Sequence, residues 1–231
     1  MCLAFTGAAV FGGFRLIDSP TCQVFGELVS RVETTRPVVA LTFDDGPTDE
    51  GVEAILPVLA ESRVHATFFV TGRALETRID LGRRLVTAGH ELGNHSYSHS
   101  RMIFIAPSTV ASEVERTDTL IRDAGYTGPI RFRPPYGKKL VELPWYLRQT
   151  GRVSVTWDVA PDSDPTLAAD ADKMATEVVR RVRPGSIVLM HVMHPTGEAS
   201  RRAVPAIVDG LERRGFDFVT VSELLAIRER P

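Results

Sequence analysis

The strongest constraint on the fold is an alternation that starts at Val38, in which short apolar runs are separated by longer amphipathic segments. The short runs are rich in β-branched and aromatic residues, and they lie at 38–43, 66–70, 91–95, 130–133, 153–157, 186–190 and 216–220. Helices are predicted between and after them at about 49–61, 78–88, 109–124, 139–149, 169–182, 200–214 and 222–228. This alternation is typical of βαβ units and a parallel sheet.

Seven such units can close into a (β/α) barrel or form an open doubly wound sheet. The residue pattern alone does not choose between these two architectures. In both of them the loops at the carboxyl ends of the strands are where chemistry is expected.

Size and charge narrow the class of protein. The chain has 231 residues, 43% of them hydrophobic, and a net charge of −2, which fits one globular domain with a full core and leaves two small domains as the alternative. Its 27 basic and 29 acidic residues are intermixed along the chain. No basic surface for a phosphate backbone is expected, and nucleic acid is an unfavoured partner.

The role of the first residues does not follow from the alternation of strands and helices. Residues 1–13 are apolar and have no basic residue before Arg15, so they lack the charged start of a secretion signal and are too short to span a bilayer. Two interpretations stay open, a clipped export or anchor segment and a hydrophobic element packed on the domain. We divide the chain into an N-terminal segment, 1–36, and a main domain, 37–231, in which the strand and helix alternation lies. A single Cys2–Cys22 disulfide is possible, but two cysteines cannot form a disulfide framework.

Ionisable side chains gather after five of the predicted strands. They are Asp44 and Asp45 after the first, His95 and His99 after the third, Arg133 and Tyr136 after the fourth, Asp158, Asp162 and Asp164 after the fifth, and His191 after the sixth. Because the carboxyl ends of parallel strands meet at one rim, these groups are expected to converge.

The sequence Gly93-Asn-His-Ser-Tyr-Ser-His99 suggests a metal site. On a helical turn the i, i+4 spacing would place the imidazoles of His95 and His99 on one face. A lone pair with this spacing is common by chance. With a carboxylate from the same rim it becomes a His-His-carboxylate set, which is typical of catalytic zinc and of other divalent ions.

Asp44 and Asp45 are adjacent carboxylates at the end of a buried strand. Two such groups are best tolerated as anions when a cation neutralises one of them. A metal on Asp45 would leave Asp44 free to take a proton from water that the ion activates. The alternative is that Asp-Asp-Gly-Pro serves only as a turn and a helix N-cap.

His191 is the candidate general acid because it ends a strongly apolar strand at the same rim. His194 competes for that role. His65 and His90 lie at strand starts, the other end of the sheet, and are expected to be structural.

The segment Arg131-Phe-Arg-Pro-Pro-Tyr-Gly137 offers two further groups. Arg133 would orient Asp44 or would be a solvated cation on the rim. Two prolines stiffen the turn before Tyr136 and could hold its backbone N–H ready as an oxyanion donor.

Taken together, these segments resemble polysaccharide deacetylases of the NodB-homology type, carbohydrate esterase family 4. VALTFDDGPT resembles the first family motif, GHELGNHSYSH the second, RFRPPYG the third and PGSIVLMH the fifth, in family order over about residues 37–226. The resemblance implies a distorted (β/α)7-8 barrel and metal-dependent hydrolysis of N-acetyl, sometimes O-acetyl, groups on an acetylated glycan of chitooligosaccharide or peptidoglycan type.

The same resemblance implies the cofactor and the residue roles. The cofactor is a divalent metal, zinc before cobalt, nickel or manganese, with no other cofactor. The implied roles are Asp44 as base, Asp45, His95 and His99 as metal ligands, Arg133 as support of the base, Tyr136 as backbone oxyanion donor and His191 as acid. Glycan chemistry favours a location outside the cytoplasm, although the cytoplasm stays open.

One departure concerns the fourth motif, which usually reads D-x-x-D-W in the family. Here the segment is Trp157-Asp-Val-Ala-Pro-Asp-Ser-Asp-Pro165, without tryptophan after the second acid. Asp164 is the preferred candidate for supporting His191, with Asp162 as the second choice. Because of this change, an amidohydrolase acting on a small non-sugar amide and an inactive glycan-binding module are kept as rivals. Neither the glycan nor the oligomeric state follows from the sequence.

Overall fold

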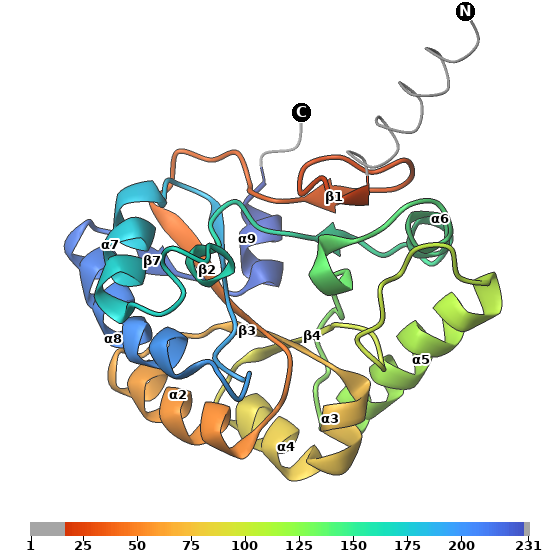
Figure 1. Ribbon diagram of the computed structural model, residues 1–231, viewed down its shortest axis with the longest axis horizontal. Helices are drawn as coiled ribbons and strands as arrows, with labels where there is room; N and C mark the ends of the chain where they lie inside the picture. Colours follow the sequence, from red (N-terminus) through yellow and green to blue (C-terminus); the bar gives the residue numbers. More distant parts are fainter. Residues whose placement is uncertain (1–16, 229–231) are drawn as a thin grey trace, which may run out of the picture.

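The computed structural model describes residues 17–228 and consists of parallel strands surrounded by helices (Figure 1). The strands are β1 (Leu28–Val29), β2 (Val38–Asp44), β3 (Thr67–Val70), β4 (Glu91–Asn94), β5 (Ser154–Val155), β6 (Ser186–Met190) and β7 (Asp217–Phe218). The helices are α2 (Asp49–Glu61), α3 (Gly72–Thr77), α4 (Ile79–Thr87), α5 (Pro107–Asp123), α6 (Glu142–Gln149), α7 (Ala171–Arg181), α8 (Glu198–Arg213) and α9 (Val221–Ile227). Two 3₁₀ turns, η1 (Pro135–Gly137) and η2 (Pro161–Ser163), follow the fourth and fifth strand positions.

The strands confirm the expected parallel α/β fold. Four strands pair in the order β4-β3-β2-β6, β7 pairs with β2, and β1 pairs with β5 in a second sheet. All five of the strand pairs run parallel. Phe132 bridges both Asn94 and Ser154, which links the two sheets into one curved path. Within residues 17–228 this path is an interrupted ladder, so the barrel is distorted and open rather than continuously closed.

The core lies on both faces of the central strands. All seven residues of β2 are buried, and Val39, Leu41 and Phe43 pack on one side with the apolar faces of α2, α4, α7 and α8. Ala40, on the alternate face, packs with α9. Burial of each large apolar side chain contributes roughly 2 kcal/mol. A strand that is apolar on both faces, as β2 is, is what a parallel sheet covered by helices requires.

Three local differences from the sequence expectation have physical causes. The segment 130–133 is not a regular strand, because Pro129, Pro134 and Pro135 around it have no N–H to continue a ladder. The short helix α3 and the two-residue strand β1 are too short to produce a periodic pattern. In the segment predicted as one helix over 139–149, α6 starts only at Glu142, since Lys139 instead bridges Met102.

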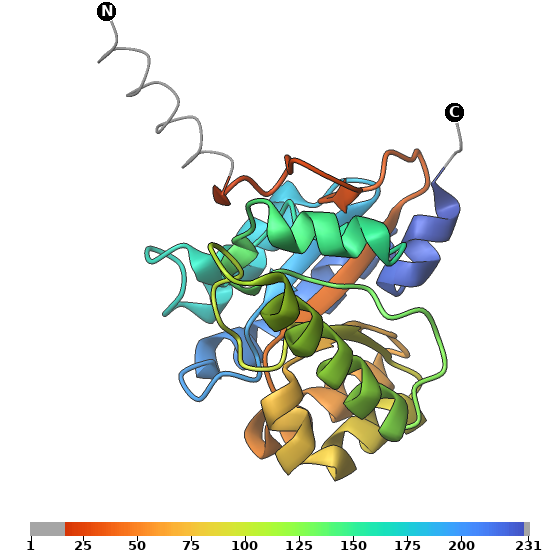
Figure 2. The same ribbon diagram turned by 90° about the vertical axis from the view of Figure 1, so that its right-hand side faces the viewer.

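The segment that precedes β2 packs on the loops that follow β5 and η1, near the carboxyl ends of the strands. The Oγ1 of Thr156 donates a 2.6 Å hydrogen bond to the carbonyl of Pro20, and the Lys139 ammonium donates to the carbonyls of Ser19 and Gly137. In the view of Figure 2 this segment runs along the same end of the molecule as α6, which packs beside α5. The possible export segment and the partner in a Cys2–Cys22 bridge lie outside the described residues.

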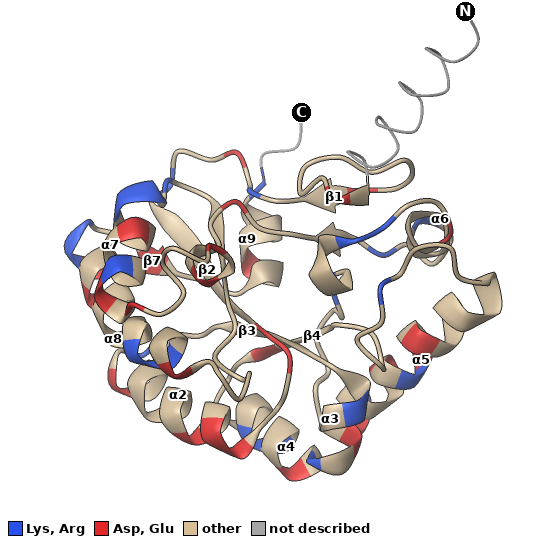
Figure 3. Ribbon diagram, viewed as in Figure 1, with Lys and Arg blue, Asp and Glu red and all other residues tan. Residues whose placement is uncertain are grey.

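Charge is spread over the surface without segregation by sign. Basic and acidic side chains alternate along the outer helices, and several form i, i+3 or i, i+4 pairs on α7 and α8 (Figure 3). Between residues 17 and 228 no helix is both long and apolar enough to cross a membrane.

Candidate active site

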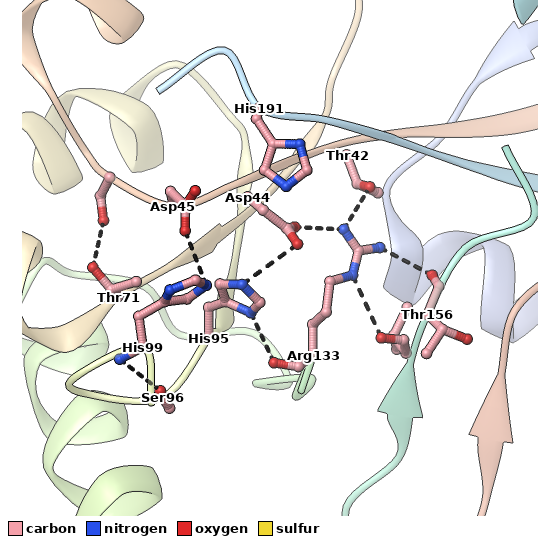
Figure 4. A network of polar contacts seen from close by, with 12 residues as sticks. Thr42, Asp44, Asp45, Thr71, His95, Ser96, His99, Arg133, Thr156 and His191 are labelled. Atoms are coloured by element: carbon pink, nitrogen blue, oxygen red, sulfur yellow. Dashed lines mark hydrogen bonds and ion pairs between the residues drawn. The ribbon is translucent and has the colours of Figure 1, made fainter. Parts of the chain in front are cut away.

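The adjacent aspartates at the end of β2 point to different neighbours (Figure 4). Asp44 is the last residue of β2 and is only 2% exposed. Asp45 has a left-handed backbone with φ of 71°, and Gly46 follows with φ of 69°. Aspartate tolerates this conformation better than most residues. The turn directs Asp44 towards Arg133 and His95, and Asp45 towards His99.

Arg133 is fully buried, and its guanidinium is held by several acceptors. It donates to Asp44 Oδ1 at 2.6 Å and to Thr42 Oγ1 at 2.8 Å. The same guanidinium reaches the carbonyls of Val155 at 3.4 Å and Thr156 at 3.1 Å. The expectation that Arg133 lies beside Asp44 is confirmed, and the alternative of a solvated rim cation is wrong. Asp44 therefore has its charge neutralised and its orientation fixed.

His95 and His99 converge, but they do so through a loop rather than a helical turn. Ser96 and His99 have positive φ values of 63° and 58°, so the premise of a helical i, i+4 stack is wrong. The Nε2 of His95 lies 3.5 Å from Asp44 Oδ2, and the Nε2 of His99 lies 3.3 Å from Asp45 Oδ1. The two imidazole rings are 4.9 Å apart between centroids.

The donor set of Asp45, His95 and His99 fits a divalent metal. One ligand atom from each residue lies within 4.8 Å of the others. The Nδ1 of His95 is 2.8 Å from the carbonyl oxygen of Arg133. A carbonyl can only accept, so this contact places the proton on Nδ1 and leaves the Nε2 lone pair available. One carboxylate and two imidazoles with room for further ligands are the chemistry of catalytic zinc and related ions.

His191 follows β6 and is bound to Asp162. The His191 backbone N–H donates to Asp162 Oδ2 at 2.6 Å, and its ring Nδ1 lies 3.1 Å from Oδ1. Ser200 donates to the same carboxylate at 2.9 Å. Burial works against a charged imidazole, but Asp162, with smaller contributions from Asp44 and Asp45, raises the pKa of His191 to about 9. The contact with Asp162 thus favours the protonated form of the His191 imidazole.

The preference for Asp164 as the partner of His191 is wrong. The Asp164 carboxylate is exposed and accepts hydrogen bonds from the N–H and Oγ1 of Thr166. Asp162 lies within η2, a turn with three residues per turn, so residues two apart point to different sides. Burial alone would raise the pKa of Asp162, but hydrogen bonds from His191 bring it below the ordinary value. Asp158 binds Ser186 and Ile187 N–H and does not enter the site.

The reactive groups line one pocket of about 1050 Å³. Tyr136, which has φ of 58°, borders this pocket, and its ring packs on His99 at 4.6 Å between centroids. Trp157 lines the wall as well, so the pocket has an indole from the residue before Asp158 although the fourth motif lacks its usual tryptophan. The sequence pattern did not identify this role of Trp157.

The remaining histidines lie at two different ends of the strands, as their places in the chain predict. His194 lines the outer pocket and shares a 2.8 Å hydrogen bond with Thr196, away from the Asp162 carboxylate. His90 is buried among the starts of strands, where its Nδ1 accepts from the N–H of Ala66, and its ring lies 6.0 Å from that of His65. These positions favour His191 over His194 as the histidine that faces the chemistry.

Comparison with known proteins gives a consistent result. Residues 31–155 match the family described as polysaccharide deacetylase. A chitooligosaccharide deacetylase from Bradyrhizobium sp. (strain ANU 289) is 35% identical over 205 residues, which cover 84% of this chain and 92% of that protein. A crystal structure of the Bc1960 peptidoglycan N-acetylglucosamine deacetylase is 29% identical with a TM-score of 0.80, covering 87% of this chain and 94% of that one.

A third similarity is to a protein described as a pseudoenzyme of the same family, the wild-type BA3943 protein from Bacillus anthracis. It is 26% identical with a TM-score of 0.77, covering 90% of this chain and 70% of that one. The family match spans more than half of the chain, and the fold and the order of the motifs agree with it. This chain belongs to the polysaccharide deacetylase family, carbohydrate esterase family 4.

Proposed function

We propose that the protein is a metal-dependent deacetylase that removes N-acetyl groups from a glycan containing N-acetylglucosamine, of chitooligosaccharide or peptidoglycan type, and releases acetate. The observation that carries this proposal is that one pocket holds both a candidate proton acceptor and a candidate proton donor. The Asp44 carboxylate, held by Arg133, and the His191 imidazole, held by Asp162, both border the Asp45–His95–His99 donor set.

Asp45, His95 and His99 would hold the metal, zinc before cobalt, nickel or manganese. Such an ion polarises a carbonyl and makes water more acidic. Metal affinity depends on neutral imidazoles, and burial together with the nearby His95 lowers the pKa of His99. These features support the ligand roles of the two histidines.

Asp44 acts as the general base in this proposal. It removes a proton from the water that attacks the acetamide carbonyl carbon, and the Arg133 guanidinium keeps the carboxylate turned to the pocket. The Tyr136 backbone N–H would stabilise the negative charge that develops on the carbonyl oxygen.

His191 completes the reaction as the general acid. Asp162 binds the Nδ1 side of the ring, which leaves Nε2 as the proton donor towards the pocket. When the C–N bond breaks, that proton goes to the departing sugar amine, and the hydroxyl that came from water remains on acetate.

The test is acetate release from a panel of acetylated chitooligosaccharides and peptidoglycan fragments. A chelator should abolish release, and zinc or cobalt should restore it. The variant Asp44→Asn should keep its metal and lose most turnover. Near-normal turnover of Asp44→Asn, or activity that is insensitive to chelation, would contradict the proposal.

Two rivals are separable by the same assay. The altered fourth motif, with no tryptophan after Asp164, leaves room for a small non-sugar amide, so cyclic imides and formamides belong in the panel. An inactive glycan-binding module would bind glycan tightly and release no acetate; the presence of Asp44, Arg133 and His191 in bonding geometry disfavours it. Because peptidoglycan, one of the two proposed substrates, lies outside the cytoplasmic membrane, we also propose a place outside the cytoplasm.

A further inference from the structure

The loop between the two metal-site histidines is held from outside by a single carboxylate on α5. Glu113 Oε2 accepts hydrogen bonds from the backbone N–H of Tyr97 at 2.9 Å and of Ser98 at 2.8 Å. Its other oxygen accepts from the Ser98 hydroxyl at 2.8 Å. Glu113 lies on a different element from both histidines, 14 residues after His99, and has no role in the chemistry described above. Three bonds to two consecutive loop residues make it the main acceptor for this turn.

The other anchors act on the first half of the loop, on its carbonyls, or within the loop, where the backbone N–H of His99 donates to Ser96 Oγ at 3.1 Å. Asn94 Oδ1 accepts from the N–H of Ser96 at 2.8 Å. The carbonyls of Ser96 and Tyr97 accept from the first N–H groups of α3, which start at Gly72. A Cβ at Gly72 would lie 2.6 Å from the Tyr97 ring, so α3 and the loop are tightly apposed. These bonds leave the N–H groups of Tyr97 and Ser98 to Glu113.

The three ligands differ in how they are fixed. Asp45 directly follows β2, and the His95 ring is held through Nδ1 by the Arg133 carbonyl. His99 has a positive φ, of 58°, as Asp45 does, but it comes at the end of the loop, and its N–H donates to Ser96 Oγ within that loop, so its backbone position depends on the loop. Non-glycine residues keep such conformations only where surrounding contacts impose them. His99 is thus the ligand whose position is most sensitive to Glu113.

We propose that Glu113 is a positioning residue of the metal site, which holds His99 in ligating position through the backbone of Tyr97 and Ser98. The inference rests on the proposed metal role of Asp45, His95 and His99. Groups that orient metal ligands change metal affinity by about tenfold to a hundredfold when they are removed. The same size of effect is expected here, although Glu113 acts through the backbone and not through a histidine ring.

The experiment measures zinc affinity of the purified, metal-free full chain by competition with a chromogenic chelator, with no glycan present. Glu113→Ala should bind zinc about tenfold to a hundredfold more weakly than wild type. Glu113→Gln keeps an oxygen that can accept both N–H groups, and should recover most of the affinity. Glu115→Ala is the matched control, because Glu115 lies two residues away on the same helix and accepts only from the Tyr146 hydroxyl with its side chain.

A double-mutant cycle locates the effect. In a His99→Ala background, Glu113→Ala should cause little further loss of zinc affinity, whereas general loosening of the domain would add its full effect. Wild-type affinity in Glu113→Ala, or a loss in Glu113→Gln as large as in Glu113→Ala, overturns the inference. A wild-type chain that binds no zinc would overturn the metal site itself, while failure to release acetate with zinc affinities as expected would overturn only the proposed reaction.

Discussion

A buried arginine is tolerable at position 133 because every direction of its guanidinium meets an acceptor. Removing it would leave the Asp44 carboxylate buried beside His95 without its cation. Breaking a buried pair by loss of one partner costs about 3–5 kcal/mol. We therefore expect Arg133→Met to lower the free energy of unfolding by roughly that amount and to abolish turnover, measured by urea denaturation and acetate release. Arg202→Met, on the exposed face of α8, is the control and should change neither quantity.

Asp162 and Asp164 provide a matched pair for testing the proton donor. Asp162→Asn removes a charge that raises the pKa of His191, so this pKa should fall from about 9 towards 6.5. The imidazole then loses its proton at lower pH, and the alkaline limb of the pH profile of kcat/KM should move to lower pH, with reduced turnover. A bound cation offsets Asp44 and Asp45, but not the direct contact with Asp162. Asp164→Asn should leave the profile unchanged; an equal shift in both variants would refute the assignment.

Most of the site could be predicted from the sequence, because the rule that strand ends meet at one rim needs only the order of the elements. That rule predicts that five residues lie close together, namely Asp44, Asp45, His95, His99 and His191. The choice between Asp162 and Asp164 could not be made, since it depends on how η2 turns. Glu113 was not predictable either, because a carboxylate in the middle of an amphipathic helix has no local pattern that marks its acceptor role.

At the scale of elements, the strands and helices with the most regular pattern of buried residues were predicted best from the sequence. The strand β2 and the helix α2 were predicted to within a residue because a continuous buried run and a regular apolar stripe dominate their sequences. The segment 130–133 was predicted as a strand and instead makes single bridges at Phe132, since neighbouring prolines limit the ladder. The two-residue strand β1, whose place is set by its long-range pairing with β5, has no local signal.

The start of α2 connects helix stability to the rim. Thr48 Oγ1 accepts from the N–H of Gly51 at 3.2 Å and donates to the carbonyl of Met193 at 3.0 Å. Thr48→Ala should lower the free energy of unfolding by about 1 kcal/mol, as loss of an N-cap does. Thr48→Ser retains the hydroxyl and should retain most of the stability in the same urea titration. If both variants were equally unstable, the methyl group rather than the cap would carry the effect.

At the scale of the whole molecule, the two ends of the strands differ in the polar groups that they carry. The carboxyl ends carry charged groups that are paired across elements, as in Asp44–Arg133 and Asp162–His191. The amino ends are closed by buried polar contacts, such as Glu91 accepting from Thr67 and Ser222. Substitutions among the buried polar residues at the amino ends should therefore change the free energy of unfolding without changing the pH profile of the reaction.

His90 allows that separation to be tested. Burial, with a smaller contribution from His65, lowers the pKa of His90 to about 4, whereas an unfolded histidine titrates near 6.5. Between these values the unfolded chain binds more protons, so the free energy of unfolding should fall as the pH drops from about 6.5 to about 4, by up to roughly 3 kcal/mol. His90→Asn, whose amide oxygen can accept from Ala66 N–H, should flatten that dependence in urea titrations of the metal-free protein. His194→Asn, at the exposed rim, should keep the wild-type slope; an unchanged slope in His90→Asn would show that other groups cause the acid sensitivity.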